Sequence, residues 1–391
     1  MFFTINLIIN YLNIILYALD CRGINMVNIN KTALNHIHRQ LGANMVEFAG
    51  WDMPIWYTSI IDEHMAVRNS VGIFDVSHMG DITIKGKDTM DFLSKIFTND
   101  PRRCQVGDMR YTHLCNEKGQ VMDDMIMYKY SDDHFFVVPN GATADMVWKW
   151  FQKHSKGFKI EMTNTTTDWY CIAVQGPKGV ATVQKLTKED LSPMKFFSFR
   201  EVDLGVGEKV MTCRSGYTGE DGFELVGPNK FAEPLWKKLV AAGKEFGMKP
   251  IGLAARDTLR LEKGFLLSGS DFHNDRTPLE CGVGWAVKFD HDFIGKAPIE
   301  KQKQKDEYEH FRGFVCLEPG IPRHGCTIEV SGKQIGTVTS GTMSPVLKKG
   351  IALGFLPKKY IAAGTKVDIV VRDRKIKAVV HDFPMVPNNK K

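Results

Sequence analysis

The chain has 391 residues, of which 43% are hydrophobic and 25% are charged, and its formal net charge is +6. This composition is ordinary for a soluble enzyme and argues against extended disorder, and the length predicts two or three domains that share interfaces. The lysines and arginines are scattered among nearly as many acids, which argues against a dedicated nucleic-acid-binding protein, although Pro101-Arg102-Arg103 could form a small basic patch. An anionic small molecule or an acidic partner protein suits this charge better.

The eight cysteines stand singly, without a CxxC pair or a nearby histidine that would complete a zinc site. They are predicted to be reduced structural thiols in a reducing compartment, and no metal site is expected.

The segment Phe2 to Leu19 is nearly apolar and about as long as a short membrane helix. Three asparagines interrupt it, no Lys or Arg precedes it, and no clear cleavage site follows, so a secretory signal is not expected and membrane contact is disfavoured. Two interpretations stay open: a real anchor, or a translation start at Met26 that makes the segment an artefact.

From Lys31 onward, short strands and amphipathic helices mix without strict alternation, which predicts an α+β fold. Apolar side chains recur at helical spacing from Thr89 to Phe97 and from Phe231 to Phe246; the second helix would be capped by Asn229 and would carry Pro234 in its first turn. Strands are predicted at 81–85, 125–130, 135–138 and 170–175, with hairpin turns at 116–119 and 131–133.

Residues 293–309 are rich in Lys, Gln, Asp and Glu and predict a solvated helix that leads into a linker. Beyond them, Val367, Ile369 and Val371 alternate with polar residues, and frequent glycines mark turns, as in a small all-β domain. The predicted organisation is an N-terminal extension (1–30), a region of two intertwined α+β lobes (31–298) and a C-terminal β-barrel domain (299–391).

Several catalytic motifs are missing from the sequence. Gly205-Val206-Gly207 lacks the third glycine of a dinucleotide fingerprint, and neither a phosphate-loop GK[ST] nor an HExxH sequence is present. Ser77 and His78 are adjacent but lack the nucleophile-elbow motif of a hydrolase. Nicotinamide, nucleoside triphosphate and zinc chemistry therefore have no support in the sequence.

Asp123 and Asp124 are adjacent carboxylates where a predicted turn feeds a strand, so their side chains must point to opposite faces. One of them should point inward, where an acid between apolar walls can stabilise positive charge or exchange a proton. The alternative is a turn acid next to a solvent-exposed acid. The alternation alone does not say which acid points inward.

The segment Arg214 to Leu225 combines three glycines with an aromatic residue and several acids. Glycine permits close backbone approach to a flat ligand, Tyr217 offers a stacking face, and Glu224 can accept paired N–H donors such as those of a pterin ring. The alternative is a glycine-rich hairpin with surface acids.

In Gly252 to Glu262, Arg256 and Arg260 fall on one helical face, and Asp257 and Glu262 could pair with them. Arg256, near the start of the helix, could form a fork to a carboxylate or carbonyl of a ligand. The alternative is a structural network of salt bridges.

These segments belong to an ordered series of motifs: Phe48-Ala-Gly-Trp-Asp-Met-Pro54, Gly72-Ile-Phe-Asp-Val-Ser-His-Met79, Val121-Met-Asp-Asp-Met-Ile126, Gln175-Gly-Pro177, Ser215-Gly-Tyr-Thr-Gly-Glu-Asp-Gly-Phe-Glu224, Gly252-Leu-Ala-Ala-Arg-Asp-Thr-Leu-Arg-Leu-Glu262 and Gly336-Thr-Val-Thr-Ser-Gly341. In the order and spacing of these motifs the chain resembles, from about Lys31 to Pro387, the T-protein (aminomethyltransferase) family of the glycine cleavage system.

The resemblance implies a three-domain cloverleaf around a central channel that holds tetrahydrofolate. It implies that the catalytic acid is Asp124, with Asp123 as an outward or supporting neighbour and with Tyr128 on the same strand face. Folate and substrate contacts are implied for Met79, Asp123, Tyr128, Asn140, Tyr217, Glu224, Arg256 and Trp285.

The implied reaction moves an aminomethyl group from the lipoyl arm of the H-protein to tetrahydrofolate and releases ammonia. The expected location is the cytoplasm, or the mitochondrial matrix if the organism is eukaryotic. The alternatives are another folate-dependent demethylase or one-carbon transferase that uses a small-molecule donor, and a non-catalytic folate-binding protein; against the latter, Lys263-Gly264 is followed by Phe265 instead of the cysteine of a KGC-type motif.

Two positions depart from the family pattern. Ser268 stands where many members have an aromatic residue, and the tail from Val386 to Lys391 lacks the tyrosine that closes the folate site in some members. The contacts to the outer part of the folate are therefore less defined than those to the pterin.

Overall fold

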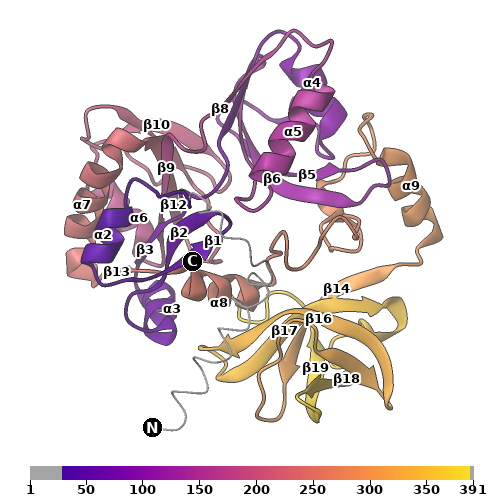
Figure 1. The fold of residues 1–391 in the computed structure, drawn as a ribbon. Coiled ribbons are helices and arrows are strands. Elements are labelled where there is room, and N and C mark those ends of the chain that lie inside the picture. Colours follow the sequence, from indigo (N-terminus) through magenta and orange to yellow (C-terminus); the bar gives the residue numbers. More distant parts are fainter. Residues whose placement is uncertain (1–28, 388–391) are drawn as a thin grey trace. The chain divides into compact units, whose positions relative to one another are not determined.

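The computed structural model describes residues 29–387, and from Lys31 onward these residues form one compact unit. The predicted extension, residues 1–30, lies outside the described residues except for positions 29 and 30, as does the apolar segment Phe2 to Leu19. The chain builds a mixed sheet and an antiparallel sheet, both with helices against them, and a closed barrel (Figure 1), which confirms the α+β class and the all-β C-terminal region.

A six-stranded sheet in the order β10-β11-β12-β9-β3-β13 forms the first lobe. All neighbours are antiparallel except the β3/β13 pair. The strands are β3 (Gly72–Asp75), β9 (Trp169–Gln175), β10 (Phe199–Asp203), β11 (Lys209–Cys213), β12 (Gly222–Pro228) and β13 (Lys249–Pro250).

Strand β9 shows how this sheet is buried on both faces. Its residues Tyr170, Ile172 and Val174 pack in one core with α2 (Asn35–Gln40), α6 (Gly179–Gln184) and α7 (Ala232–Gly243). The alternate residues Cys171 and Ala173 pack in a second core on the opposite face. This second core lies between the first lobe and the next sheet.

The second lobe is a five-stranded sheet in the order β5-β6-β7-β4-β8. Its strands are β4 (Ile82–Lys85), β5 (Met109–Cys115), β6 (Val121–Ser131), β7 (His134–Val138) and β8 (Glu161–Asn164). On one face Met125 and Met127 pack in a core with α4 (Thr89–Ile96) and α5 (Ala144–His154). On the other face Tyr128 and Phe136 pack in the core shared with the first lobe.

A closed six-stranded antiparallel barrel in the order β14-β17-β16-β15-β18-β19 follows. Its strands are β14 (Glu309–Cys316), β15 (Thr327–Val330), β16 (Lys333–Ser344), β17 (Lys349–Pro357), β18 (Lys366–Val371) and β19 (Arg374–His381). In β18, Val367 and Ile369 point into the barrel core, as the alternation predicted. Closure of the barrel removes exposed sheet edges.

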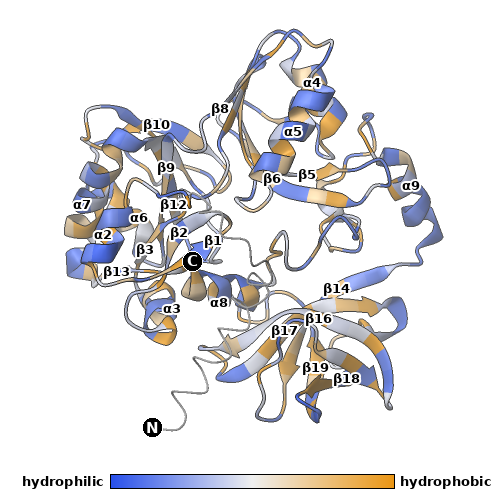
Figure 2. Cartoon of the chain, viewed as in Figure 1, coloured by the Kyte–Doolittle hydropathy of each residue, from blue (hydrophilic) through white to orange (hydrophobic). Residues whose placement is uncertain are grey.

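The remaining elements connect these parts. They are the hairpin β1 (Asn44–Phe48) and β2 (Trp51–Trp56), the helices α3 (Ile60–Asn69), α8 (Leu253–Lys263) and α9 (Lys296–Lys305), and the short 3-10 turns η1 (Pro101–Arg103), η2 (Asn229–Phe231), η3 (Lys244–Phe246), η4 (Gly284–Ala286) and η5 (Lys358–Tyr360). Hydrophobic and hydrophilic residues are mixed along most of the helices and strands, whereas α9 is mainly hydrophilic (Figure 2). None of the helices in residues 29–387 combines the length and apolar composition that a membrane-crossing helix needs.

The predicted helices, strands and turns lie close to where the sequence placed them, with one wrong detail. Asn229 does not cap α7, because the 3-10 turn η2 precedes the helix and the Asn229 side chain donates a hydrogen bond to the carbonyl of Thr167 instead. Pro234 lies in the first turn of α7, as expected. The predicted solvated helix is α9, although its Ile299 is fully buried, and the predicted domain boundary after residue 298 falls inside this helix.

Candidate active site

The two adjacent carboxylates lie on β6, in a hairpin with β5. The predicted turn at 116–119 connects these strands, and the register places Asp123 opposite Leu114 and Asp124 opposite His113. Asp124 follows the same alternation as Tyr128, so both belong to the face that looks toward the first lobe. Asp123 belongs to the face covered by helices, together with Met125 and Met127.

Asn140, which follows β7, holds both acids with one side chain. Its Nδ2 atom lies 2.9 Å from Asp123 Oδ1, 2.8 Å from Asp124 Oδ1 and 2.8 Å from the Asp124 carbonyl oxygen. Its backbone N–H donates to Asp123 Oδ2 at 3.1 Å. The single amide therefore fixes the relative positions of two side chains that point to opposite faces of the strand.

Asp123 is not an outward-facing residue, so that half of the prediction is wrong. Its exposed fraction is 0%, because the loop that carries Asn140 covers this end of the strand. Asp124 is partly exposed. The geometry gives Asp123 the position of a buried support and leaves Asp124 as the acid that a ligand can reach.

Burial and repulsion from neighbouring acids set the electrostatics of this pair. Burial, reinforced by the charge of Asp124, raises the pKa of Asp123 to about 7. Burial also raises the pKa of Asp124, although hydrogen bonds from Tyr111 and Asn140 act in the opposite direction. The donors to both carboxylates are neutral groups, so no residue in the described part of the chain places a countercharge in direct contact with these acids.

Tyr111 is a site residue that the sequence analysis missed. It lies on β5, and its hydroxyl donates to Asp124 Oδ2 at 2.7 Å. Its ring stacks on Trp285 of η4, with centroids 5.5 Å apart and planes 26° apart. The predicted hairpin turn at 116–119 was the available signal, because it sets the register that brings residue 111 diagonally across from residue 124.

A second cluster contains Tyr217, Glu224 and Arg256. The guanidinium of Arg256, at the start of α8, lies 4.6 Å from the centre of the Tyr217 ring. The Tyr217 hydroxyl donates to the Leu266 carbonyl, and Glu224 of β12 accepts a hydrogen bond from Ser215. All three of the predicted side chains are partly buried, so a hairpin with freely exposed acids does not describe this segment.

The two arginines of α8 differ in their partners. Arg260 is buried in a network with Asp257 and Asp271, at 2.8 and 2.7 Å. Arg256 forms no ion pair with any residue between 29 and 387. The salt-bridge interpretation thus describes Arg260, while the guanidinium of Arg256 keeps its hydrogen-bonding capacity for a ligand.

Glu262 does not pair with these arginines, which corrects the sequence prediction. Glu262 Oε2 lies 2.9 Å from Arg68 Nη2 and 3.1 Å from His64 Nε2, both on α3. Its other oxygen accepts a hydrogen bond from Ser344 of the barrel at 2.5 Å. Although burial alone would raise the pKa of Glu262, His64 and Arg68 lower it to about 2. This cluster ties α3, α8 and the barrel together.

The remaining predicted residues occupy different positions around Asp124. The ring of Tyr128 is 3% exposed and packs edge-on against Phe136 and Phe199 with centroids 5.6 Å apart, and its hydroxyl forms no hydrogen bond with the part of the chain that the structure describes. Trp285 is 63% exposed on the outer side of Tyr111. Met79 is partly buried; its neighbour Gly80 donates to the carbonyl of Pro139, next to Asn140.

Electrostatic interactions connect the two clusters. Burial raises the pKa of Tyr217, and the charge of Asp124 adds to this effect. Burial likewise raises the pKa of Tyr128, to which the charge of Glu224 contributes. The structure therefore brings together acids from β6 and β12, an arginine from α8 and aromatic side chains from four segments.

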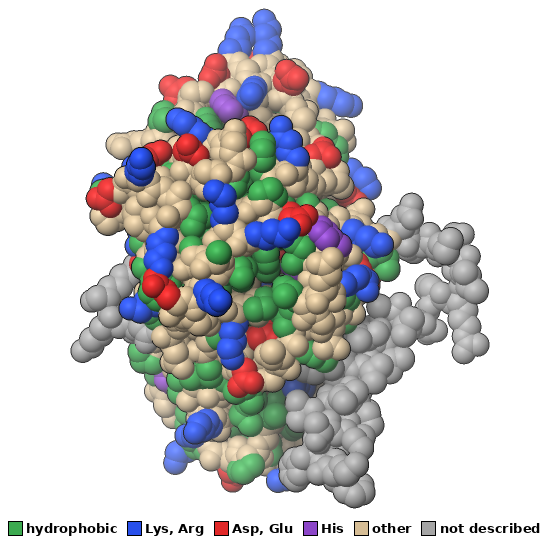
Figure 3. All heavy atoms as spheres, turned by 90° about the vertical axis from the view of Figure 1, so that its left-hand side faces the viewer, with side chains coloured by type: hydrophobic (Ala, Val, Ile, Leu, Met, Phe, Trp, Pro, Cys, Tyr) green, Lys and Arg blue, Asp and Glu red, His purple; other side chains and the backbone are tan. Residues whose placement is uncertain are grey.

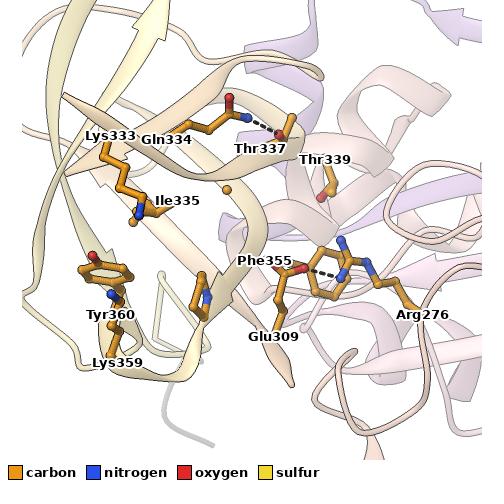
Figure 4. Close-up of a pocket in the computed structure, with 12 residues that line it drawn as sticks. Arg276, Glu309, Lys333, Gln334, Ile335, Thr337, Thr339, Phe355, Lys359 and Tyr360 are labelled. Atoms are coloured by element: carbon orange, nitrogen blue, oxygen red, sulfur yellow. Dashed lines mark hydrogen bonds and ion pairs between the residues drawn. The ribbon is translucent and has the colours of Figure 1, made fainter. Parts of the chain in front are cut away.

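A separate hollow lies at the barrel, with a volume of about 420 Å³. Figure 4 shows Lys333, Ile335 and Tyr360 on one side of it and the Arg276 and Glu309 pair on the other. None of the predicted site residues lines this hollow. On the face seen from the left of Figure 1, basic and acidic side chains are interspersed (Figure 3).

The structure also bears on the cysteines. The seven described cysteines are free thiols, and six of them are buried. Between residues 29 and 387 no group of three or more His, Cys, Asp or Glu side chains could hold a metal ion.

Comparisons with known proteins cover nearly the whole described chain. Residues 34–291 match the GCVT N-terminal domain family and residues 310–387 match the glycine cleavage T-protein C-terminal barrel domain family. An aminomethyltransferase of Thermoanaerobacter sp. (strain X514) is 44% identical over 356 residues, which are 91% of this chain and 97% of the relative. An aminomethyltransferase of Caldanaerobacter subterraneus subsp. tengcongensis is 44% identical over 365 residues, 93% of this chain and 98% of the relative.

A solved structure has the same fold. The crystal structure of glycine cleavage system aminomethyltransferase T from Bartonella henselae superposes with a TM-score of 0.86 at 31% sequence identity, and the match covers 92% of this chain and 99% of that one.

Proposed function

Because the chain belongs to the glycine cleavage T-protein family, we propose that Asp124 is the carboxylate that serves its reaction. The activity of the chain is that of an aminomethyltransferase of the glycine cleavage system. The single observation that supports Asp124 is its position: it is the partly exposed member of a buried acid pair, held by neutral donors on both oxygens.

The proposed donor is an aminomethyl group on the lipoyl arm of the H-protein, and the proposed acceptor is tetrahydrofolate. In the overall reaction the aminomethyl carbon loses its bond to the lipoyl sulfur and its bond to the amino nitrogen. The same carbon forms new bonds to N5 and N10 of tetrahydrofolate. The protons that N5 and N10 lose end up on the released ammonia and on the free lipoyl thiol. The folate supplies the two nucleophilic nitrogens. The protein has to orient the reactants and stabilise developing positive charge.

The residues around Asp124 suit a pterin. Glu224 presents carboxylate oxygens to paired N–H donors, and the guanidinium of Arg256, which forms no ion pair with residues 29–387, suits a carbonyl or carboxylate. The hydroxyl of Tyr128 has no partner in the described chain and can donate to or accept from a ligand. In this proposal Tyr217, Trp285 and Met79 supply the apolar contact surface, and the two lobes and the barrel surround a central channel.

Asp124 acts in this scheme as a fixed charge and a proton acceptor. A carboxylate in a poorly hydrated site stabilises a nearby cation more strongly than it would in water. Its two hydrogen bonds fix the carboxylate, so little reorganisation is required when positive charge develops. Asn140 and the buried Asp123 support this geometry from the other side of the strand.

Purified protein should release ammonia only when lipoylated H-protein carrying the aminomethyl group and tetrahydrofolate are both present. Asp124→Asn should lower kcat by about 10²- to 10⁴-fold, the range for loss of a positioned acid or base. Folate binding, measured by calorimetry, should persist in the variant, because the predicted pterin contacts remain.

Asp292→Asn is the matched control, since it makes the same chemical change at a fully exposed carboxylate, and it should keep wild-type activity. Full activity in Asp124→Asn would remove Asp124 from the mechanism. Turnover without any lipoyl carrier would instead favour a folate-dependent transferase with a small-molecule donor.

A further inference from the structure

The carboxylate of Asp124 accepts a hydrogen bond on each of its two oxygens. Asn140 Nδ2 approaches Oδ1 at 2.8 Å, and the Tyr111 hydroxyl approaches Oδ2 at 2.7 Å. One donor would leave the carboxylate free to rotate about its last torsion, whereas two donors on different oxygens fix the plane. Tyr111 therefore decides which way the second oxygen points.

The position of Tyr111 follows from the β5/β6 register. Tyr111 pairs with Ile126 and His113 pairs with Asp124, so Tyr111 and Asp124 are diagonal neighbours on one face of the sheet. The tyrosine side chain is long enough to bridge this diagonal. Because both residues belong to the regular part of one antiparallel pair, the sheet itself sets the distance between hydroxyl and carboxylate.

The ring of Tyr111 is held on two sides. Trp285 stacks on it at 5.5 Å, and the His113 ring meets it edge-on at 5.0 Å. Trp285 is itself 63% exposed, so it stands between Tyr111 and solvent. Burial raises the pKa of the Tyr111 hydroxyl, which keeps it a hydrogen-bond donor across the physiological pH range.

The titratable groups that surround Asp124, on its own face of the sheet or next to it in the strand, come from several elements. They are Asp123 on β6, Tyr111 and His113 on β5, Tyr217 before β12, Asp271 in the segment after α8, and Cys281. Burial lowers the pKa of His113 to about 3, so this histidine is neutral near pH 7. Of the groups in hydrogen-bond contact with the Asp124 carboxylate, Tyr111 is the hydroxyl donor.

We propose that Tyr111 is a positioning residue that orients the Asp124 carboxylate through its hydroxyl, with Trp285 as the cover that keeps this hydrogen bond out of water. The proposal rests on the proposed role of Asp124. In this proposal Trp285 shields the hydrogen bond to Asp124, in addition to the folate contact that the sequence resemblance implies.

Tyr111→Phe removes only the hydroxyl and keeps the ring that Trp285 covers. The variant should lose about tenfold in kcat, since one hydrogen bond to a charged group is lost. The acid limb of the kcat/KM profile should move to higher pH, because Asp124 loses a donor that stabilises its ionised form. KM for tetrahydrofolate should change by less than about twofold, as no predicted pterin contact is removed.

Tyr130→Phe is the matched control. Tyr130 lies on β6, and its hydroxyl bonds Glu201 at 2.9 Å, away from Asp124. This variant should keep both the rate and the pH profile of the unmodified protein. An unchanged kcat and acid limb in Tyr111→Phe would overturn the proposal.

Site-specific replacement of Tyr111 by 3-fluorotyrosine provides a test that preserves the fold. Its hydroxyl is a stronger donor, so the acid limb should move to lower pH, and an unmoved limb would overturn the proposal even if Tyr111→Phe failed to fold. Asp124→Asn is assayed in parallel. If it retains activity, the proposed role of Asp124 fails; if it is inactive while Tyr111→Phe matches the unmodified protein, only the positioning role of Tyr111 fails.

Discussion

Two buried acid clusters of this protein have opposite electrostatic characters. At Asp123 and Asp124 the acids adjoin each other and are held by neutral donors, and their pKa values are raised. At Glu262 the acid is flanked by Arg68 and His64, and its pKa is lowered to about 2. Glu262 and Asp123 are both 0% exposed, so burial itself does not explain the difference.

The contrast shows that the groups in contact with a buried acid decide whether the acid suits a structural role or a role in the reaction. A buried acid with a cation in contact is stabilised in its charged form and contributes to the fold when intact. A buried acid with only neutral donors has a raised pKa, and because no protein cation pairs with it, a cationic ligand can supply the charge that stabilises its ionised form. Glu262 is therefore interpreted as a structural residue that connects α3, α8 and the barrel, and Asp124 as the acid that serves the reaction.

The largest effect on stability is expected at Glu262. Glu262→Gln removes one of the two carboxylates that pair with the buried Arg68; the other is Glu220, whose Oε1 lies 2.9 Å from Arg68 Nη1. Loss of one member of a buried pair costs about 3–5 kcal/mol. The free energy of unfolding, measured by urea denaturation, should fall by this amount.

Glu117→Gln is the control for this change, since Glu117 forms an exposed ion pair with Lys153 at 3.7 Å. Its cost should be about 0–1 kcal/mol. Equal losses in the two variants would contradict the structural role of Glu262.

The next largest effect is expected in how the free energy of unfolding depends on pH, because the two acid clusters should contribute with opposite signs. The pKa of Asp123 is raised from 3.8 to about 7, so between these values the folded protein keeps a proton that the unfolded chain has released. Its contribution to the free energy of unfolding must therefore fall as the pH rises from about 4 to 7, by at most about 1.4 kcal/mol for each pH unit. Asp123→Asn should remove this slope, as measured by denaturation at several pH values.

The cluster at Glu262 should behave in the opposite way. The pKa of Glu262 is lower in the folded protein than in the unfolded chain, where it is 4.5. Its contribution to the free energy of unfolding is therefore present above pH 4.5 and is lost as the pH falls toward about 2. Asp292→Asn, at a fully exposed carboxylate, should leave the slope between pH 4 and 7 unchanged. A slope that survives in Asp123→Asn would show that other groups cause it.

The smallest effect is expected at Arg256, and it concerns the affinity for tetrahydrofolate. Arg256 forms no ion pair within the described residues, in contrast to Arg68. Arg256→Gln should weaken tetrahydrofolate binding about tenfold, equal to about 1.4 kcal/mol, and should change stability little. Calorimetric titration measures the affinity, with Arg374→Gln on the exposed β18/β19 hairpin as the control. Unchanged affinity would exclude Arg256 from the folate site.

Local patterns in the sequence predicted most of the fold. The helical spacing from Thr89 to Phe97 and the alternation in Val367, Ile369 and Val371 correspond to α4 and β18. Alternation also established that Asp123 and Asp124 point to opposite faces. It could not reveal that Asp123 is buried, because the cover comes from Asn140, on a loop that only the folded chain brings to this strand.

Contacts between distant segments account for the features that the sequence analysis missed. Glu262 is paired by α3, which lies 194 residues away in the chain, so helical spacing within α8 suggested the wrong partners. Tyr111 carried no motif, and its role depends on strand register. Asn229 is drawn away from α7 by the carbonyl of Thr167. Patterns within one segment predict its own element well, whereas partners from other segments appear only in the tertiary structure.

The most direct test of the central claim compares Asp124→Asn with Glu262→Gln in both activity and stability. The account predicts that Asp124→Asn loses kcat by about 10²- to 10⁴-fold without losing stability, while Glu262→Gln loses about 3–5 kcal/mol of stability and its folded fraction keeps kcat. Parallel losses of activity and stability in both variants, or full activity in Asp124→Asn, would contradict the division of the two acid clusters into chemistry and structure.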